Sequence, residues 1–324
     1  MTPLFYHLFD FALINLAVIG VGYFMIREKM IFQSWMLLAV SIIGVHLIFI
    51  YEHPVMRMLA LIVTTFTAMK VVAVAKGYQH KNLTLSFIQW AIFAAGWMGM
   101  RAEPFETLGG KPLPGAWQMI RFGASRVVAG VLLIALAHGV VSIPLNKEFA
   151  YILVSAILLV GFSLLLHFGV LGISAGTWRL RGVNTHVLFK DPAKSTSLTE
   201  FWGKRWNVAF SEMTSITIFR PLRGRVGAAA ALMIAFIFSG ILHEVALSVP
   251  VNAGYGLPTL YFIIQATTVL VEKVLLQKKV AFLHHHVYAR VWTLFWVIVP
   301  MPLLFHEQFI KQVLWPMAGL SGIY

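Results

Sequence analysis

The segment 227–249, "GAAAALMIAFIFSGILHEVALSV", is an apolar run long enough to cross a lipid bilayer. About 20 helical residues span a hydrocarbon core of about 30 Å, and inside lipid only helices and closed barrels satisfy their own backbone. The run is continuous rather than alternating, so it predicts a transmembrane helix. His243 lies in this run with Glu244 beside it. Ionisable groups within a span usually face a protein interior or a water-filled cavity, which makes His243 a candidate functional residue.

The composition of the whole chain extends this prediction. Of its 324 residues, 59% are hydrophobic and only 11% are charged, which indicates an all-α, polytopic integral membrane protein. The spans predicted from the apolar runs are 4–25, 34–50, 55–75, 127–143, 149–175, 227–249, 257–272 and 291–305. We expect one membrane-embedded domain over residues 1–324, in which the first run is a retained span rather than a secretory signal.

The distribution of cations bears on a further apolar stretch, 83–100. Cytoplasmic loops of membrane proteins carry an excess of Lys and Arg. If this stretch does not cross, 21 of the 25 Lys and Arg residues share one side, and if it crosses the asymmetry collapses. We therefore expect a re-entrant or interfacial segment and eight crossings, rather than nine, with both ends opposite the cations. The net charge of +13 then reflects topology and anionic headgroups, not a nucleic-acid surface.

Residues 200–213, "EFWGKRWNVAFSEM", concentrate aromatic, cationic and amide side chains outside the predicted spans. Ser197 followed by Glu200 is a capping-box pattern, so we predict a helix from about Ser197 to Arg220, where Pro221 ends it. Its simplest interpretation is an amphipathic helix at the headgroup boundary, anchored by tryptophan.

That interpretation leaves Asn207 unexplained. On the predicted helix Asn207 shares a face with Gly203 and Glu200, directed toward a packed region, and Gly203 lets a ligand or another backbone approach closely. Upstream, residues 101–121 contain three glycines and two prolines within seven positions, which predicts a turn-rich loop.

Other polar residues compete with His243 for a functional role. His138 and His167 lie in predicted spans, where hydrogen bonding between helices is the simpler explanation. The triplet at 284–286 suggests a metal site, but no second histidine cluster matches it, so we interpret it as a surface feature. Lys70 lies inside a span and can be read either as a transporter's charge or as a snorkelling side chain. The chain contains no cysteine, which excludes disulfides and a cysteine acyl-enzyme.

Two motifs taken together resemble the membrane-bound O-acyltransferase (MBOAT) superfamily, and more closely its wax-synthase-like branch. That branch carries a segment of the form S-x-x-x-F-W-G-R-R-W-N followed by S-G-x-x-H-E, and here residues 197–207 read "SLTEFWGKRWN" and residues 239–244 read "SGILHE". Lys204 replaces the more usual arginine and keeps its charge. The resemblance is strong over about 197–275, and over the first 175 residues only the apolar profile matches.

The resemblance implies an MBOAT-like helical fold with an internal tunnel and a motif-bearing core at about 176–275. It also implies transfer of a fatty acyl group from acyl-CoA to the hydroxyl of a lipophilic alcohol, with His243 as the catalytic base and Asn207 as the second polar residue. Asn207 can either polarise the thioester carbonyl or orient the acceptor. The substrate-binding residues expected around this pair are Trp202, Trp206, Gly203, Arg205, Lys204 and Glu244.

The residue chemistry is compatible with these roles. A neutral imidazole can take the hydroxyl proton as oxygen attacks the thioester, and a desolvated histidine stays neutral near pH 7. Nine cations between 176 and 225 suit the phosphates of CoA arriving from the cytosolic side of a bacterial inner membrane or an endoplasmic reticulum. We expect acyl-CoA as a co-substrate, membrane lipids as surroundings, and no metal or permanently bound cofactor.

Two alternatives remain open from the sequence. The first is a secondary transporter that uses Lys70, His138, His167 or His243 as coupling groups, although neither inverted repeats nor paired broken helices are evident. The second is a catalytically inactive scaffold with the same fold.

Overall fold

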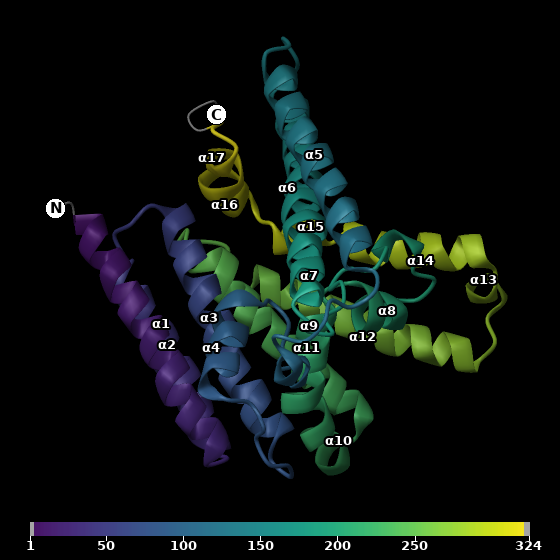
Figure 1. Ribbon diagram of the computed structural model, residues 1–324. Helices are drawn as coiled ribbons and strands as arrows, with labels where there is room; N and C mark the ends of the chain where they lie inside the picture. Colours follow the sequence, from purple (N-terminus) through teal and green to yellow (C-terminus); the bar gives the residue numbers. More distant parts are fainter. Residues whose placement is uncertain (1–2, 321–324) are drawn as a thin grey trace. The chain divides into compact units, whose positions relative to one another are not determined.

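The computed structural model describes residues 3–320, and every regular element within them is helical (Figure 1). The chain forms two compact units. The first combines the residues up to Glu103 with Lys190–His306, and the second combines Pro104–Phe189 with the residues from Glu307 onward. The predicted motif-bearing core at 176–275 draws on both units, and one domain over residues 1–324 stays a prediction.

Eight helices or helical runs in the described residues are long and apolar enough to cross a membrane. They are α1 (Pro3–Arg27), α2 (Ile31–Ile48), α3 (Pro54–Gly77), α5 (Ala116–Val141), the run of α6 (Lys147–Phe162), η2 (Ser163–Val170) and α7 (Leu171–Leu180), the run of α11 (Ala228–His243) and η6 (Glu244–Ser248), α12 (Leu257–Gln277), and the run of α14 (His286–Ile298) and α15 (Met301–Leu304). Each predicted span overlaps one of these eight candidate spans.

Shorter elements connect these helices. They are α4 (Phe87–Gly96), η1 (Glu103–Thr107), η3 (Pro192–Lys194), α8 (Leu198–Glu200), η4 (Phe201–Arg205), α9 (Val208–Thr214), η5 (Ser215–Phe219), α10 (Arg220–Val226), α13 (Ala281–His284), α16 (Glu307–Phe309), η7 (Ile310–Leu314) and α17 (Trp315–Met317). Of these, η1 and η3 are 3₁₀ turns, whereas η4, η5 and η7, like η2 and η6, are π-helical turns.

The largest boundary error of the sequence prediction concerns α5, which begins 11 residues before the predicted start at 127. Gly115 adopts a left-handed conformation with φ +80°, and the helix starts directly after it. The predicted span leaves out Arg121 and Arg126, which α5 includes. A helix tolerates such residues near its end, since their long side chains can reach toward the headgroups.

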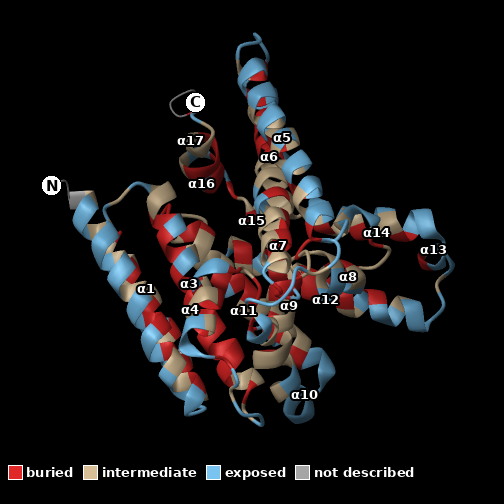
Figure 2. Ribbon diagram, in the orientation of Figure 1, coloured by how far each residue is buried: buried red, intermediate tan, exposed pale blue. Residues whose placement is uncertain are grey.

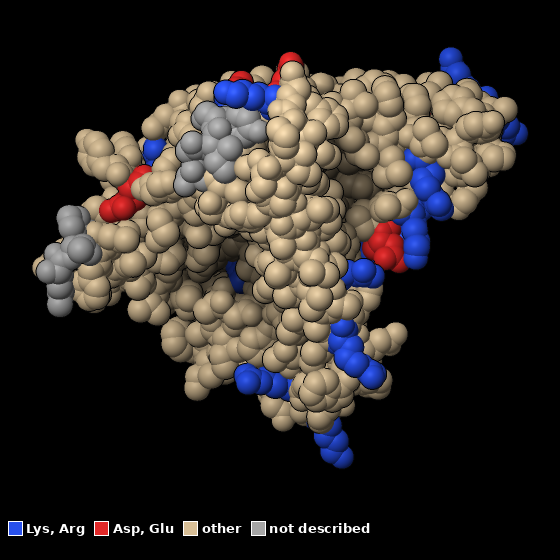
Figure 3. Space-filling model, turned by 90° about the horizontal axis from the view of Figure 1, so that it is seen from above, with Lys and Arg blue, Asp and Glu red and all other residues tan. Residues whose placement is uncertain are grey.

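The outer faces of the spans are apolar and exposed, as a lipid environment requires. Figure 2 shows exposed residues along most of α1, and the described part of that helix includes Leu16, 64% of whose surface is accessible. Phe32 on α2 is 73% exposed, and charged side chains cover little of the face shown in Figure 3. Soluble monomers rarely expose apolar patches of this extent. The protein is an integral membrane protein with an all-α fold.

Helix α3 is the most buried span of the first unit, and it packs against α1 and α2 (Figure 2). Leu61 of α3 and Val45 of α2 are fully buried in one cluster, and Val245 from the π-helical turn η6 packs against that cluster. This contact anchors the end of the run that carries His243. The core of the first unit therefore reaches the candidate site.

The stretch 83–100 forms only the ten-residue helix α4, as the distribution of cations led us to expect. Ten residues rise about 15 Å, which is half of a hydrocarbon core. The ammonium group of Lys70 donates to the carbonyl oxygens of Phe93 (3.2 Å), Ala94 (2.6 Å) and Trp97 at the end of this helix. Lys70 is 2% exposed, so the snorkelling interpretation is wrong. Its cation instead compensates the negative end of the α4 dipole.

In the second unit, α5 lies antiparallel to the run 147–180 through a stripe of small residues. Ala116, Gly123, Gly130 and Ala137 are buried and stand seven positions apart. A Cβ atom added to Gly130 would lie 2.7 Å from the carbonyl oxygen of Gly161, whereas one added to Gly139 would meet nothing within 4 Å. Small residues let the two backbones approach closely, as in many membrane helix pairs.

Candidate active site

The segment 197–226, predicted as one helix up to Arg220, is interrupted at Trp206 and Asn207. The predicted start is confirmed, because the Ser197 hydroxyl accepts a hydrogen bond from the Glu200 N–H at 3.0 Å. The helix then widens into the π-helical turn η4, in which the Trp206 N–H donates to the Phe201 carbonyl. Trp206 itself is extended, with ψ 120°. Such π-helical turns often accompany functional sites.

Asn207 restarts the helix in the left-handed conformation, with φ 45°. Asparagine tolerates this region better than most residues, and its side chain can cap the following helix. Its Oδ1 atom accepts a hydrogen bond from the Phe210 N–H at 3.3 Å, so Asn207 is the N-cap of α9. The prediction that Asn207 shares a helical face with Gly203 and Glu200 is therefore wrong.

The predicted helix end at Pro221 is also wrong. Pro221 occupies the first turn of α10, where a proline does not disrupt the helix, and α10 continues to Val226. The prediction treated Pro221 as the end of a regular helix, whereas a new helix, α10, begins directly after the π-helical turn η5.

His243 is the last residue of α11, and a backbone carbonyl orients its ring. The Nδ1 atom lies 2.7 Å from the Ser239 carbonyl oxygen. Because a carbonyl oxygen only accepts, Nδ1 must carry the hydrogen, which leaves Nε2 of a neutral imidazole as a proton acceptor. The ring packs against Phe262 at a centroid distance of 4.4 Å and meets Phe210 edge-on at 6.0 Å.

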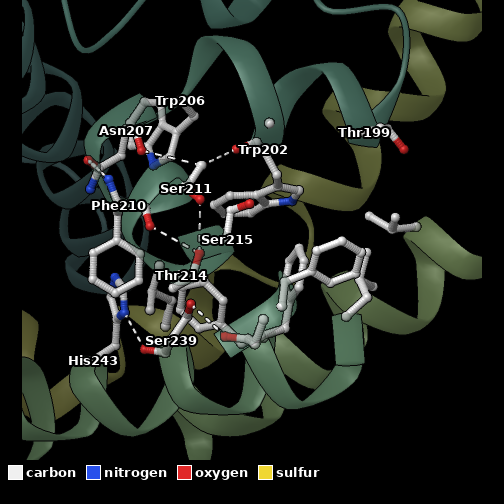
Figure 4. A pocket seen from close by; sticks show the side chains of 18 residues that line it. Thr199, Trp202, Trp206, Asn207, Phe210, Ser211, Thr214, Ser215, Ser239 and His243 are labelled. Carbon is white, nitrogen blue, oxygen red and sulfur yellow. Dashed lines mark hydrogen bonds between the residues drawn. The ribbon is translucent and has the colours of Figure 1, made fainter. Parts of the chain in front are cut away.

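Asn207 and His243 line one pocket of about 270 Å³, which lies wholly within the first unit (Figure 4). Phe210 connects them, since its N–H binds the Asn207 side chain and its ring contacts His243. The wall is mostly aromatic and aliphatic, and its other polar side chains are the hydroxyl groups of Thr199, Ser211, Thr214, Ser215 and Ser239, together with the indole rings of Trp202 and Trp206. An apolar cavity with a few convergent polar groups is typical of a ligand site.

The pocket extends along one face of α11. That helix contributes Leu232, Ala235, Phe236, Ser239 and His243, which follow one another at intervals of one to four residues. The 11 steps from the first to the last correspond to about 16 Å of helix. His243 marks one end, and the other end lies one turn from the start of α11, which follows the cationic helix α10. The internal tunnel that the resemblance implies stays a prediction.

Three of the six predicted substrate-binding residues line the pocket, namely Trp202, Trp206 and Gly203. Gly203 is also exposed, and a Cβ atom added there would meet nothing within 4 Å, so the pocket reaches the molecular surface at this residue. Lys204 is exposed and is not part of the lining.

Arg205 and Glu244 have structural partners instead. Arg205 forms an ion pair with Glu200 at 2.7 Å and donates to the carbonyls of the preceding loop. One carboxylate oxygen of Glu244 accepts from the N–H groups of Gly256 and Thr259, each at 3.0 Å, at the start of α12. Among the described residues, Glu244 makes no hydrogen bond to the imidazole of His243.

Glu200 shows how the sequence motif stabilises its own loop. Burial alone would raise the pKa of its carboxyl group, but hydrogen bonds from the Thr196 N–H and from Arg205 more than offset this, and the pKa lies below its usual value. The arginine in the motif therefore supports the turn before Asn207 rather than the pocket.

Residues that sequence reasoning missed include the hydroxyl groups on either side of the pocket. Ser239 precedes His243 by four positions and Ser211 follows Asn207 by four, so helical periodicity places each near its motif residue. This four-residue spacing is the feature of the sequence from which the two hydroxyl groups could have been predicted. The Ser211 hydroxyl donates to the Trp202 carbonyl, which links α9 to η4 across the interruption.

The other candidate residues lie apart from this pocket. His138 binds the Ala318 carbonyl at 2.8 Å and His167 contacts the Ser163 hydroxyl at 3.3 Å, both within the second unit. The triplet 284–286 is exposed, as predicted. Between residues 3 and 320, no group of three or more His, Asp or Glu side chains could hold a metal ion.

The segment that surrounds the pocket is similar to known proteins. Residues 185–264 match the membrane bound O-acyl transferase family. The long-chain-alcohol O-fatty-acyltransferase of Simmondsia chinensis is 36% identical over 72 residues, 20% of either chain. Two proteins of Arabidopsis thaliana, the probable long-chain-alcohol O-fatty-acyltransferases 1 and 9, are 34% identical over 73 residues and 27% identical over 145 residues.

These alignments cover 21% and 42% of the two Arabidopsis proteins, and 20% and 40% of this chain. The aligned part thus spans less than half of each relative. The family match at 185–264 nevertheless contains the interrupted helix, Asn207, His243 and most of the pocket lining. Residues 185–264 are thus similar to the membrane bound O-acyl transferase family, and part of the chain is similar to long-chain-alcohol O-fatty-acyltransferases.

Proposed function

We propose that this protein is an O-acyltransferase that moves a fatty acyl group from the thioester of acyl-CoA to the hydroxyl of a lipophilic alcohol. The observation that carries the proposal is the convergence of Asn207 and His243, 36 residues apart in sequence, on one apolar pocket. The names of the relatives, long-chain-alcohol O-fatty-acyltransferases, support the same substrate class.

In the proposed reaction, Nε2 of His243 accepts the proton of the alcohol while its oxygen attacks the thioester carbonyl carbon. A carbon–oxygen bond forms, the carbon–sulfur bond breaks, and the proton passes from the imidazolium to the departing CoA thiolate. The hydrogen bond from Nδ1 to the Ser239 carbonyl supports this role, because it fixes the tautomer and the plane of the ring.

Asn207 is proposed to stabilise the negative charge that develops on the thioester oxygen. Its Oδ1 atom already accepts from Phe210, so the Nδ2 amide group is the part available for a substrate. Nδ2 can only donate, which favours an oxyanion contact over acceptance of the alcohol proton. A donor placed at developing charge in a site with little water typically contributes on the order of 100-fold in rate.

The acyl donor is proposed to enter from the cationic side of the membrane. The α10 segment carries Arg220, Arg223 and Arg225, all exposed, and α11 begins directly after it. Cationic groups of this kind attract the phosphates of CoA. We place this side in the cytosol because cytoplasmic loops are enriched in Lys and Arg.

The proposal is tested by incubating the purified protein in detergent or vesicles with radiolabelled long-chain acyl-CoA and a panel of alcohols of different chain length. We expect a labelled ester from the wild type and no ester above background from His243→Ala, although this variant should bind acyl-CoA. Retained ester formation by His243→Ala contradicts the proposed mechanism. Binding without turnover by the wild type indicates an inactive scaffold, and flux of a solute without ester formation indicates a transporter.

A further inference from the structure

Two buried polar side chains on α12 have no place in the reaction proposed above. Gln265 and Glu272 are 0% and 1% exposed, and they lie seven positions apart, on one face of a candidate membrane span. Neither lines the pocket. An acid or an amide within a span is costly to desolvate unless its polar atoms are paired, and such residues are seldom retained without a role.

Glu272 binds the beginning of the motif segment. Its two carboxyl oxygens lie 3.0 and 2.9 Å from the Leu198 nitrogen, and one of them lies 3.4 Å from the Thr199 nitrogen. Both N–H groups belong to the first turn of the helical stretch 198–205, where no intrahelical acceptor exists. Glu272 therefore fastens the start of this stretch to α12, and its charge suits a helix N-terminus.

Gln265 binds the middle of the same stretch. Its Oε1 atom accepts from the indole N–H of Trp202 at 3.1 Å, and its Nε2 group donates to the Trp296 carbonyl at 2.6 Å. The amide thus has a partner on each side, one in the motif and one in α14. These two hydrogen bonds fix the orientation of the amide, and the amide in turn fixes the position of the Trp202 ring.

Trp202 in turn connects to both candidate catalytic residues. Its carbonyl oxygen accepts from the hydroxyl of Ser211, whose helix α9 is capped by Asn207. Its ring packs at 5.7 Å from Phe262, the ring that lies 4.4 Å from the imidazole of His243. A shift of Trp202 would therefore displace the Asn207 side of the pocket relative to the His243 side.

We propose that Gln265 and Glu272 are positioning residues for acyl transfer, which hold the stretch 198–205 and Trp202 so that Asn207 faces His243 across the pocket. This inference rests on the proposed function. Small displacements of a catalytic group lower the rate strongly, so loss of either anchor should lower kcat more than it raises KM.

The test uses Gln265→Leu and Glu272→Leu, which are close in size to the native residues and remove the acceptor oxygens, with Thr268→Val as the matched control. Thr268 is 5% exposed on the same helix, but its hydroxyl binds only the Ile264 carbonyl of that helix among the described residues. We expect each anchor variant to lose roughly tenfold to a hundredfold in kcat, with KM changed less than about threefold. The control should keep the wild-type kcat and a similar melting temperature.

A double-mutant cycle separates positioning from general stability. Trp202→Phe keeps an aromatic ring but removes the indole N–H that Gln265 accepts. If Gln265 acts through this bond, the double variant loses no more kcat than the worse single variant. The inference would be overturned if the loss of kcat in the double variant equalled the product of the two single losses. Wild-type kcat in both anchor variants would overturn it as well.

The same series keeps the inference distinct from the proposed function. His243→Ala is assayed in parallel, and activity in that variant refutes the proposed function whatever the anchors do. An inactive His243→Ala with fully active Gln265→Leu and Glu272→Leu refutes only the positioning role. Should Gln265→Leu fail to fold, Trp202→Phe and Glu272→Leu each still remove one anchor and decide the outcome.

Discussion

Asn207 combines two tasks that a single substitution can separate. Its Oδ1 atom caps α9, whereas its Nδ2 group is proposed to bind the thioester oxygen. Aspartate is an equally good N-cap and tolerates the left-handed conformation, but it offers no N–H donor when ionised.

We predict that Asn207→Asp keeps the melting temperature of the wild type within a few degrees but loses on the order of 100-fold in kcat. Asn207→Ala should lose a similar factor in kcat and, in addition, about 1 kcal/mol of stability from the missing cap. Steady-state ester formation and thermal unfolding in the same detergent check both. Near wild-type kcat in Asn207→Asp would show that the residue serves only as a cap.

At the scale of single residues, the sequence motifs predicted Asn207 and His243 as candidate site residues, but not the contacts around them. The motifs "FWGKRWN" and "SGILHE" contain Asn207 and His243, and both line the pocket. The left-handed turn at Asn207 was not foreseen, because a regular helical period was extended through a segment whose hydrogen bonds widen to a π-helical turn. The partners of Glu244 and Arg205 depend on loops that only the tertiary structure brings close.

In the second unit, the backbones of α5 and the run 147–180 lie in close contact. Helix α5 meets the run 147–180 through glycine and alanine, and Gly130 has backbone atoms where a side chain would lie. Gly139 stands on the same helix in open space and provides a matched control.

We predict that Gly130→Ala lowers stability by about 1–3 kcal/mol, since the added methyl group must push two backbones apart. Gly139→Ala should leave stability unchanged or raise it by up to about 1 kcal/mol, because alanine favours the helix over glycine. Thermal unfolding followed by circular dichroism compares the two variants. Equal melting temperatures for both would contradict the close contact.

At the scale of elements, hydropathy predicted the spans well because lipid exposure leaves long apolar runs with little ambiguity. The ends were harder: α5 includes Arg121 and Arg126, which composition alone assigned to a loop. The anchors Gln265 and Glu272 were missed as well. A signal was present, since an acid follows an amide by seven positions within one apolar span.

The whole molecule is expected to cross the membrane eight times, with the short helix α4 remaining on one side. The chain lacks cysteine, so single cysteines can report the side of each loop without background. Lys81 and Lys194 are exposed in two different connections, and Glu148 is exposed in the first turn of α6.

We predict that Lys81→Cys and Lys194→Cys react with a membrane-impermeant maleimide from the same side of sealed vesicles, and that Glu148→Cys reacts from the opposite side. Labelling of inverted and right-side-out vesicles provides the measurement, with detergent-solubilised protein as the control for reactivity. If Lys81→Cys and Lys194→Cys are labelled from opposite sides, the stretch 83–100 crosses and the count of spans is nine.

The surface opening at Gly203 has a consequence for how such an enzyme could diversify. A pocket whose rim includes a residue without a side chain is as wide there as the backbone permits, and every other amino acid would narrow it. Substrate length or branching could therefore be selected by changing one codon at the entrance, while the imidazole and the amide beyond it keep their chemistry. Substrate preference among close relatives can then diverge faster than activity is lost.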